Sequence, residues 1–310
     1  MARRTLTAMF CASVIASSAG AAPVSVPLWP NSAHIGNPRA KGPEQTGKGK
    51  SLVGGRPWTQ ISNVSQPSLT IYPAQGQPTG ATVVVLPGGG YRVLAMDLEG
   101  TEVCDWLTPR GITCVVLKCR VPASGPWWNP DCNCRENPKV WMALQDAQRA
   151  LRLLRQGAET YGIDPNRIGV LGFSAGGHLA AAVSTRTEAV YAPVDSADAQ
   201  SLRPDFAVVL YPGHLWHEPD LTLEPDIRVT PGTPPTFLLH AEDDPVDDVR
   251  HSLVYEAALK KAGIPVEMHL YARGGHAFGL RPTGLPISEW PQRVEIWLAR
   301  IGVIGTQTPK

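Results

Sequence analysis

A serine between two glycines follows an apolar segment in the middle of the chain. Residues 167–171 predict a strand, Gly-Phe-Ser-Ala-Gly stands at 172–176, and residues 179–183 predict a helix of small side chains. A serine on such a strand-to-helix turn holds its hydroxyl clear of the backbone, and the flanking glycines avoid collisions with the strand and the helix. Ser174 is therefore the candidate nucleophile.

A histidine preceded by two glycines follows the last predicted strand. A serine hydroxyl is a weak nucleophile and needs a base within hydrogen-bond reach. His276, in Gly-Gly-His-Ala-Phe at 274–278, has the position expected for that base. Activity should then rise with pH near the ordinary histidine pKa of about 6.5. The alternative is an exposed or capping loop histidine, whereas His178 is expected to pack in the helix after the serine.

Several carboxylates follow the predicted strand 236–240, in Ala-Glu-Asp-Asp-Pro-Val-Asp-Asp at 241–248. One carboxylate is needed to hold the imidazole in one tautomer and to stabilise its charged form. We favour Asp244 for this task, with Asp243 as the alternative. Asp247 and Asp248 are expected to cap the following helix. A calcium loop is a competing interpretation, but the spacing matches no known ligand pattern.

A glycine-rich loop follows the apolar strand predicted at 82–86. It reads Pro-Gly-Gly-Gly-Tyr at 87–91. The backbone N–H groups of Gly88, Gly89 and Gly90, together with that of Ala175, are expected to bind a developing negative oxygen. A phosphate cradle is the other interpretation of these glycines, but no Gly-Lys-Ser/Thr follows them.

Strands and helices alternate along the rest of the chain. This alternation predicts an α/β fold with a mostly parallel central sheet and helices on both faces, and active sites at the carboxyl ends of its strands. The further predicted strands are 69–72, 113–118, 205–211 and 266–271. The predicted helices are 101–107, 141–156, 253–262 and 289–301.

The first residues are typical of an export signal. Arg3 and Arg4 precede an apolar run at 6–15, and small residues at 19–22 suit cleavage. We therefore expect a signal peptide at 1–22 and a periplasmic or extracellular protein; a buried N-terminal helix is the alternative. A Pro/Gly-rich arm is expected at 23–65, a catalytic domain at 66–302 and a tail at 303–310.

The composition limits the partners and cofactors. The 310 residues carry a formal net charge of +1 with no basic tract, which argues against nucleic acid as a partner. The sequence has no apolar run long enough for a membrane span, and its oligomeric state stays open. We expect a small-molecule substrate and no cofactor.

The cysteines that remain after signal cleavage are odd in number, so one is free or pairs between chains. The Cys132–Cys134 segment could tie the loop after Cys119 back to the core. No second Cys/His pair lies at zinc-ligand spacing, and we expect no metal. The cysteines are Cys104, Cys114, Cys119, Cys132 and Cys134.

Taken together, these motifs resemble those of the acetyl-esterase and acetylxylan-esterase branch of the α/β-hydrolases. The resemblance rests on residues 87–91, 95–100, 172–180 and 274–278, spans about 66–302, and includes Leu-Trp-Pro at 28–30. The order serine, aspartate, histidine is also that of the α/β-hydrolase fold. The resemblance implies a secreted serine carboxylesterase for short acyl esters, commonly acetyl groups on sugars. It also supports Asp244, because the acid of this group usually directly precedes a Pro-Val-like pair.

Substrate preference is less clear from the sequence. Tyr91 is a candidate for substrate contact, as are Trp127 and Trp128 in an unusual insertion at 120–138. The two indoles could stack on a sugar or simply anchor the loop. Two other functions stay open: an exopeptidase of the prolyl-oligopeptidase type, for which the chain lacks room for a propeller, and a non-catalytic carbohydrate-binding protein, against which the intact serine, histidine and acid argue.

Overall fold

The computed structural model describes residues 21–30, 36–123, 127–129, 134–136, 139–217 and 220–305. The predicted signal peptide therefore lies almost wholly outside the described residues, as do the last five residues of the predicted tail. Within the described ranges no helix is both long and apolar enough to span a bilayer.

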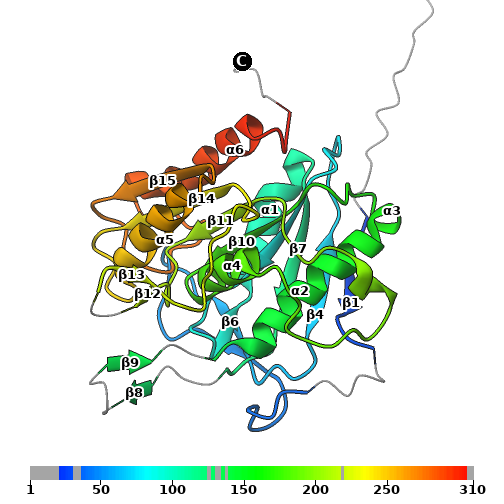
Figure 1. Ribbon diagram of the computed structural model, residues 1–310, viewed down its shortest axis with the longest axis horizontal. Helices are drawn as coiled ribbons and strands as arrows, with labels where there is room; N and C mark the ends of the chain where they lie inside the picture. The colour runs from blue at the N-terminus through cyan, green and yellow to red at the C-terminus, as the bar shows by residue number, and fades with distance from the viewer. Residues whose placement is uncertain are drawn as a thin grey trace, which may run out of the picture.

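Eight strands form the central sheet (Figure 1). Every neighbouring pair is parallel except β1–β4 and β4–β7, which are antiparallel. This confirms the α/β class and the mostly parallel sheet. In order across the sheet the strands are β1 (Val24–Pro27), β4 (Ser68–Tyr72), β7 (Thr113–Lys118), β5 (Thr82–Leu86), β10 (Ile168–Phe173), β11 (Ala207–Leu210), β14 (Thr236–Ala241) and β15 (Val266–Tyr271).

Helices cover both faces of this sheet (Figure 1). Residues of four helices join a core cluster on one face, and those of two helices join a second cluster on the other. The first group is α2 (Trp141–Gln156), α3 (Ala158–Tyr161), α4 (Ala175–Thr185) and α5 (Arg250–Lys261); the second is α1 (Glu102–Leu107) and α6 (Trp290–Arg300).

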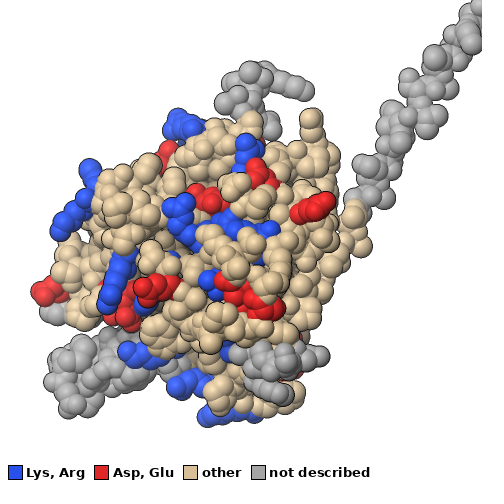
Figure 2. Space-filling view, turned by 45° about the vertical axis from the view of Figure 1, so that its right-hand side comes forward, with Lys and Arg blue, Asp and Glu red and all other residues tan. Residues whose placement is uncertain are grey.

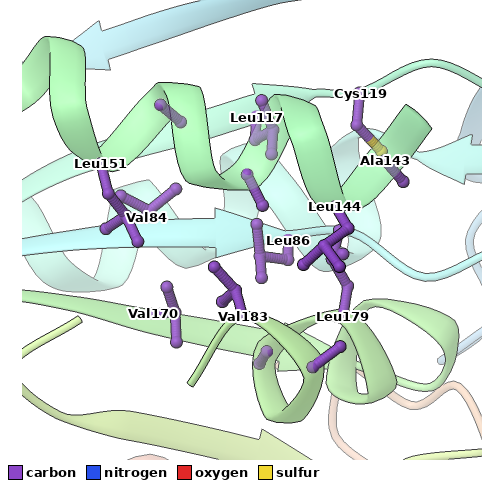
Figure 3. Packing of buried hydrophobic residues seen from close by; sticks show 14 of the residues in the cluster. Val84, Leu86, Leu117, Cys119, Ala143, Leu144, Leu151, Val170, Leu179 and Val183 are labelled. Carbon is purple, nitrogen blue, oxygen red and sulfur yellow. The ribbon is translucent and has the colours of Figure 1, made fainter. Parts of the chain in front are cut away.

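The central strand β5 shows why the sheet needs both layers. All five of its residues are buried. Val84 and Leu86 belong to the cluster under α2 and α4, whereas Val83 and Val85 belong to the cluster under α1 and α6. Figure 3 shows the first of these clusters, in which Leu86 lies between the two helices. A strand buried on both faces has no polar side to alternate with, which explains its continuous apolar run.

The described residues of the segment 23–65, which was expected to form an arm, are built into the domain. β1 lengthens the main sheet, and β2 (Gln45–Lys48) and β3 (Thr59–Ser62) form a small antiparallel sheet with β6 (Val93–Ala95). Leu28 is 1% exposed, so the segment after β1 adds to the core. β1 and β2 lie at sheet edges and leave much of their surface in solvent, so neither has the apolar run of a buried strand.

Three arginines of α2 tie that helix to the segment 195–205. Arg149 and Arg152 pair with Asp198, at 3.0 and 3.4 Å, and Arg155 pairs with Asp205 at 3.2 Å. Opposite charges are therefore neighbours here, and Figure 2 shows both signs interspersed over the face in view.

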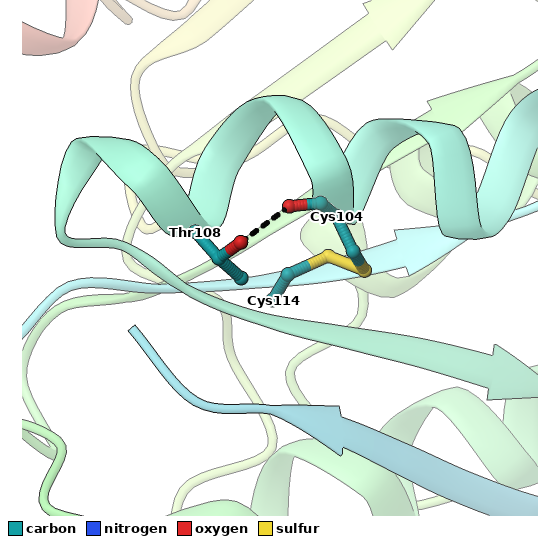
Figure 4. Close-up of a disulfide and its surroundings, with 3 residues drawn as sticks. All are labelled: Cys104, Thr108 and Cys114. Carbon is teal, nitrogen blue, oxygen red and sulfur yellow. Dashed lines mark hydrogen bonds between the residues drawn. A yellow bond between two sulfur atoms is a disulfide. The ribbon is translucent and has the colours of Figure 1, made fainter. Parts of the chain in front are cut away.

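One disulfide is present among the described residues. It joins Cys104 of α1 to Cys114 of β7, ten positions apart (Figure 4). Cys119 is a free, buried thiol, and in Figure 3 it points toward Ala143 of α2. The suggested tie from the 132–134 segment is therefore not made through Cys119. Cys132 lies outside the described residues, and nothing is described of the Cys134 side chain.

Replacing both members of the Cys104–Cys114 pair with alanine should lower the free energy of unfolding by about 2–4 kcal/mol, because the unfolded chain loses a cross-link. Thermal unfolding measured with and without reductant would test this. Reductant should lower the melting temperature of the wild-type protein and of a Cys119→Ala variant, but not that of the double variant. An equal response of all three proteins would contradict the prediction.

Candidate active site

Ser174 occupies the sharp turn between β10 and α4. Its φ of 52° and ψ of −121° lie outside the usual regions for a residue other than glycine, a conformation that costs about 1–3 kcal/mol. The neighbouring glycines allow the turn to close. A Cβ on Gly172 would lie 2.0 Å from the carbonyl oxygen of Gly176, and one on Gly176 would lie 1.9 Å from that of Leu86.

The structure brings Ser174, His276 and Asp244 together from three separate segments. His276 Nε2 lies 2.9 Å from Ser174 Oγ, and His276 Nδ1 lies 2.6 Å from Asp244 Oδ2. Ser174 follows β10, Asp244 follows β14, and His276 follows β15. All three therefore lie at the carboxyl ends of parallel strands, as expected for this class of sheet.

The surroundings of Asp244 keep it ionised. Its side chain is fully buried, and burial raises the pKa of a carboxyl group. Hydrogen bonds from His240, His276 and the amide of Asp247 outweigh that effect and hold the pKa of Asp244 well below its usual range. Asp244 can therefore face His276 as a carboxylate throughout the neutral pH range.

Nearby carboxylates raise the pKa of His276. Burial lowers it, but the hydrogen bond and charge of Asp244, then the charges of Asp247 and Glu99, outweigh burial. The net result is a pKa above the ordinary 6.5. The sequence-based expectation of a titration near 6.5 therefore needs correction upward.

Asp243, the alternative acid, has a different task. Its Oδ1 accepts hydrogen bonds of 2.8 Å from the amides of both Gly274 and Gly275. It fixes the loop that presents His276 and does not face the imidazole itself. The geometry thus distinguishes two adjacent carboxylates that the sequence left open.

Asp247 and Asp248 also differ from one another. Asp248 accepts a 2.9 Å hydrogen bond from the amide of Arg250, the first residue of α5, much as a capping residue does. Asp247 turns the other way, and its Oδ2 lies 3.3 Å from Ser174 Oγ. The expectation that Asp247 caps the helix is therefore wrong. Among the five carboxylates of residues 242–248, the turn decides which side chain faces the site.

The glycine-rich loop passes directly beside the serine. A Cβ on Gly88 would lie 3.0 Å from the Cβ of Ser174, so no larger residue fits there. Gly89, with a φ of +129°, adopts a conformation that other residues rarely reach, and a Cβ there would lie 2.3 Å from the carbonyl oxygen of Val93. Glycine at these two positions lets the backbone approach Ser174.

Gly88 is not a free donor, which corrects one of the four predicted oxyanion contacts. Its N–H donates to Glu99 Oε2 at 2.9 Å. Outside helices and strands, no hydrogen bond is seen from the N–H of Gly89, Gly90 or Ala175 to another described residue. The N–H groups of Gly89, Gly90 and Ala175 therefore remain the candidate donors.

Glu99 and Tyr211 support this loop, and sequence reasoning missed both. Glu99 is 2% exposed and accepts a 3.0 Å hydrogen bond from the Tyr211 hydroxyl through its second oxygen. Burial raises the pKa of Glu99, opposed by the charge of His276 and by these hydrogen bonds. The Tyr211 ring lies 5.0 Å from that of His276. Its position after β11 was the available signal, since Ser174 follows the neighbouring strand.

The predicted substrate contacts fare differently. Tyr91 is 4% exposed and its hydroxyl lies 2.7 Å from Nδ1 of His178, so its ring packs inside rather than facing a substrate. His178 packs there as expected, and burial keeps its pKa well below the ordinary value.

Trp127 and Trp128 lie in strand β8 (Trp127–Asn129), which pairs with β9 (Cys134–Glu136). Nothing is described of their side chains, so their role stays a prediction.

Among the described residues, no group of three or more histidine, cysteine, aspartate or glutamate side chains is placed to hold a metal ion. The chemistry that this geometry allows is nucleophilic: a strained serine, a base oriented by a buried carboxylate, and candidate backbone donors beside them.

Comparisons with known proteins found a matching family model and several similar chains. The family model BD-FAE matches residues 129–209. An acetylxylan esterase of Xylanibacter ruminicola is 29% identical over 65% of this chain and 42% of its own length. An endo-1,4-beta-xylanase B of Butyrivibrio fibrisolvens is 27% identical over 63% of this chain and 32% of its own. The chain thus spans less than half the length of these two curated relatives.

Two solved structures are similar over most of the chain. An acetyl ester-xyloside bifunctional hydrolase from Caldicellulosiruptor lactoaceticus is 33% identical, with a TM-score of 0.67 and coverage of 91% of this chain and 97% of that one. A thermophilic esterase from Thermogutta terrifontis, solved with propionate bound, is 25% identical, with a TM-score of 0.64 over 79% of this chain and 93% of that one.

Proposed function

This chain belongs to the acetyl-esterase and acetylxylan-esterase branch of the α/β-hydrolases, and on that premise we propose that it is a serine carboxylesterase that removes short acyl groups, chiefly acetyl, from carbohydrate. One observation carries the proposal: Asp244, His276 and Ser174 form a continuous row with separations of 2.6 and 2.9 Å. This is the order of contacts that activates a serine.

The first half of the reaction forms an acyl-enzyme. Ser174 Oγ attacks the ester carbonyl carbon while its proton passes to His276 Nε2. The carbonyl oxygen becomes negative and accepts hydrogen bonds from the candidate donors, the N–H groups of Gly89, Gly90 and Ala175. Each such donor is worth about 10²–10³ in rate. The bond to the alcohol oxygen then breaks, and the alcohol leaves with the proton that His276 held.

The second half repeats these steps with water. Water attacks the acyl carbon and gives a proton to His276 Nε2, and the acyl group departs as the carboxylic acid when Ser174 regains its proton. In both halves the imidazolium is stabilised by Asp244, whose lowered pKa keeps it charged.

The acyl and alcohol groups are inferred from the relatives. One is named an acetylxylan esterase, another an acetyl ester-xyloside hydrolase, and a third was solved with propionate. All three descriptions point to short acyl groups, and two of them name xylan or a xyloside. No observation favours the exopeptidase or the binding-protein interpretation.

Release of acetate from acetylated xylan tests the proposal most directly. It should be measured beside p-nitrophenyl acetate, butyrate and octanoate. We expect cleavage of acetylated xylan and of the two short esters, with octanoate the poorest substrate. Cleavage of the small esters alone would keep the serine mechanism and move the natural substrate elsewhere, and no cleavage of any would overturn the proposal.

The rate should depend on pH through His276, which accepts the serine proton only when it is uncharged. Because its carboxylate neighbours raise its pKa, kcat/KM should rise with pH around a midpoint above 6.5 and level off on the alkaline side. Initial rates with p-nitrophenyl acetate between about pH 5 and about pH 9 give this midpoint. A midpoint below 6.5 would contradict the assigned surroundings of His276.

We also propose that the protein is exported. The Cys104–Cys114 disulfide supports this, because disulfides persist mainly in oxidising compartments. Expression of the full chain, followed by fractionation and N-terminal sequencing, should give an exported protein that begins near Ala22 or Pro23. An uncleaved cytoplasmic product would contradict this proposal without affecting the catalytic one.

A further inference from the structure

A second aspartate, Asp247, faces the reacting atoms. Asp247 Oδ2 lies 3.3 Å from Ser174 Oγ and 3.7 Å from His276 Nε2. Its side chain is 14% exposed, so it is largely withdrawn from solvent but still reachable. Gly213 packs against it: a Cβ there would lie 2.5 Å from Asp247 Oδ1. Glycine at position 213 therefore leaves room for the Asp247 carboxylate beside Ser174.

The backbone of Asp247 is held on both sides. Its N–H donates to Asp244 Oδ1 at 3.0 Å, and its carbonyl oxygen lies 3.0 Å from His240 Nε2. A carbonyl oxygen only accepts, so Nε2 of His240 must carry the proton that it donates. Because the row of catalytic groups and a buried histidine fix this segment, the direction of the Asp247 side chain is built into the site.

Ser174 Oγ lies near two hydrogen-bond acceptors, His276 Nε2 and Asp247 Oδ2, but it cannot donate to both. The Ser174 hydroxyl has one proton and can give it either to His276 Nε2 or to Asp247 Oδ2. If it goes to His276, the carboxylate of Asp247 faces the lone pairs of Ser174 Oγ without a donor. If it goes to Asp247, the serine proton points away from its base. In the empty site Asp247 therefore competes with His276 for the proton that must move.

A substrate can remove this competition by bringing a donor of its own. His276 Nε2 delivers a proton to the departing alcohol oxygen, so that oxygen must lie near Nε2. Asp247 Oδ2 is 3.7 Å from the same nitrogen. A hydroxyl on the carbon next to the ester-bearing carbon is thus within reach of Asp247.

We propose that Asp247 is a specificity-determining residue, which accepts a hydrogen bond from a hydroxyl vicinal to the cleaved ester and so selects partly acylated polyols. This inference rests on the proposed esterase function and names the alcohol that the site takes. With Asp247 occupied, the serine proton returns to His276. An ester that carries a carboxylate in the same place meets a like charge and reacts poorly.

Two small esters isolate this contact. 2-Hydroxyethyl acetate offers the vicinal donor, and 2-methoxyethyl acetate replaces that proton with a methyl group while the leaving alcohols have similar basicity. A hydrogen bond to a charged group predicts that the wild-type enzyme prefers the hydroxyl ester by about 10-fold or more in kcat/KM. In Asp247→Val the preference should fall to nearly 1. Asp248→Asn, a neighbouring carboxylate that pairs with Arg250, should keep the wild-type preference.

A second variant separates charge from shape. Asp247→Asn keeps the size of the side chain and removes its negative charge. The groups that face His276 are Asp244, Asp247 and Glu99, with the Tyr211 ring beside it. Removing one of the three negative charges should lower the pKa of His276, so the acid limb of kcat/KM for 2-methoxyethyl acetate should move to lower pH. A purely structural role for Asp247 would not move it.

The outcomes distinguish this inference from the function on which it rests. Equal wild-type rates on the two esters would overturn the role of Asp247 and leave the esterase intact. So would a preference for the hydroxyl ester that stays at its wild-type value in both Asp247→Val and Asp247→Asn. Cleavage of p-nitrophenyl acetate without cleavage of 2-hydroxyethyl acetate would also overturn it. Failure on all three esters would instead overturn the esterase itself.

Discussion

Replacing Ser174 with alanine should lower kcat by about 10⁴–10⁶-fold and leave KM almost unchanged. The substitution removes only Oγ, the one atom that can form the acyl-enzyme in the proposed mechanism. The binding surface and the candidate oxyanion donors Gly89, Gly90 and Ala175 remain, and these account for the residual rate. Initial rates on p-nitrophenyl acetate measure the loss, and a fluorophosphonate should label the wild-type protein once and the variant not at all.

Ser184 provides a matched control for this experiment. It lies on α4, the helix that follows Ser174, is 2% exposed, and its hydroxyl makes no hydrogen bond within the described part of the chain. Ser184→Ala should therefore keep wild-type rates and fluorophosphonate labelling. If Ser174→Ala kept more than about a hundredth of the wild-type rate, Ser174 would not be the nucleophile.

Replacing Asp244 with asparagine should lower kcat by about 10³–10⁴-fold. The carboxamide is nearly the same size, but it has no negative charge and offers one acceptor oxygen in place of two. His276 then loses the charge that stabilises its imidazolium and the contact that fixes its tautomer. Asp247 cannot replace Asp244, because it lies on the Nε2 side of the ring and the tautomer is fixed at Nδ1.

Folding must be checked for this variant, since Asp244 also binds the amides of Val246 and Asp247. Near-UV circular dichroism and the melting temperature show whether Asp244→Asn is folded. The pH profile gives a second readout: the acid limb should shift to lower pH, because the strongest influence raising the pKa of His276 is gone. A folded variant with less than a tenfold loss would point to another acid.

The elements that could be predicted from sequence are those with a clear apolar run or a clear helical period. β5, β7, β15 and α2 begin and end at the expected residues, because apolar runs or a 3.6-residue period end abruptly at charged residues, proline or glycine. The strands of residues 23–65 escaped because β2 is a short, mostly exposed strand of polar residues. Such a strand is stabilised by hydrogen bonds to its partner strand. These bonds involve the backbone, so they leave no periodic pattern of side chains in the sequence.

The residues of the candidate site also divide into those that could be predicted from sequence and those that could not. Ser174, His276 and one of two adjacent aspartates could be predicted, since each follows a recognisable strand in a glycine- or acid-rich segment. The capture of the Gly88 amide by Glu99 could not, because the two residues meet through a fold in the chain rather than through spacing. Nor could the direction of Asp247, which depends on backbone hydrogen bonds to Asp244 and His240.

The buried thiol of Cys119 is a built-in probe of local unfolding. Cys119 is 3% exposed and burial raises its pKa, so in the folded chain it is both shielded and protonated. Alkylating reagents need a thiolate that they can reach. Modification of Cys119, followed by mass spectrometry of its peptide, therefore counts the openings of the layer between β7 and α2. The frequency of these openings can be timed under catalytic conditions without a dye or an introduced residue.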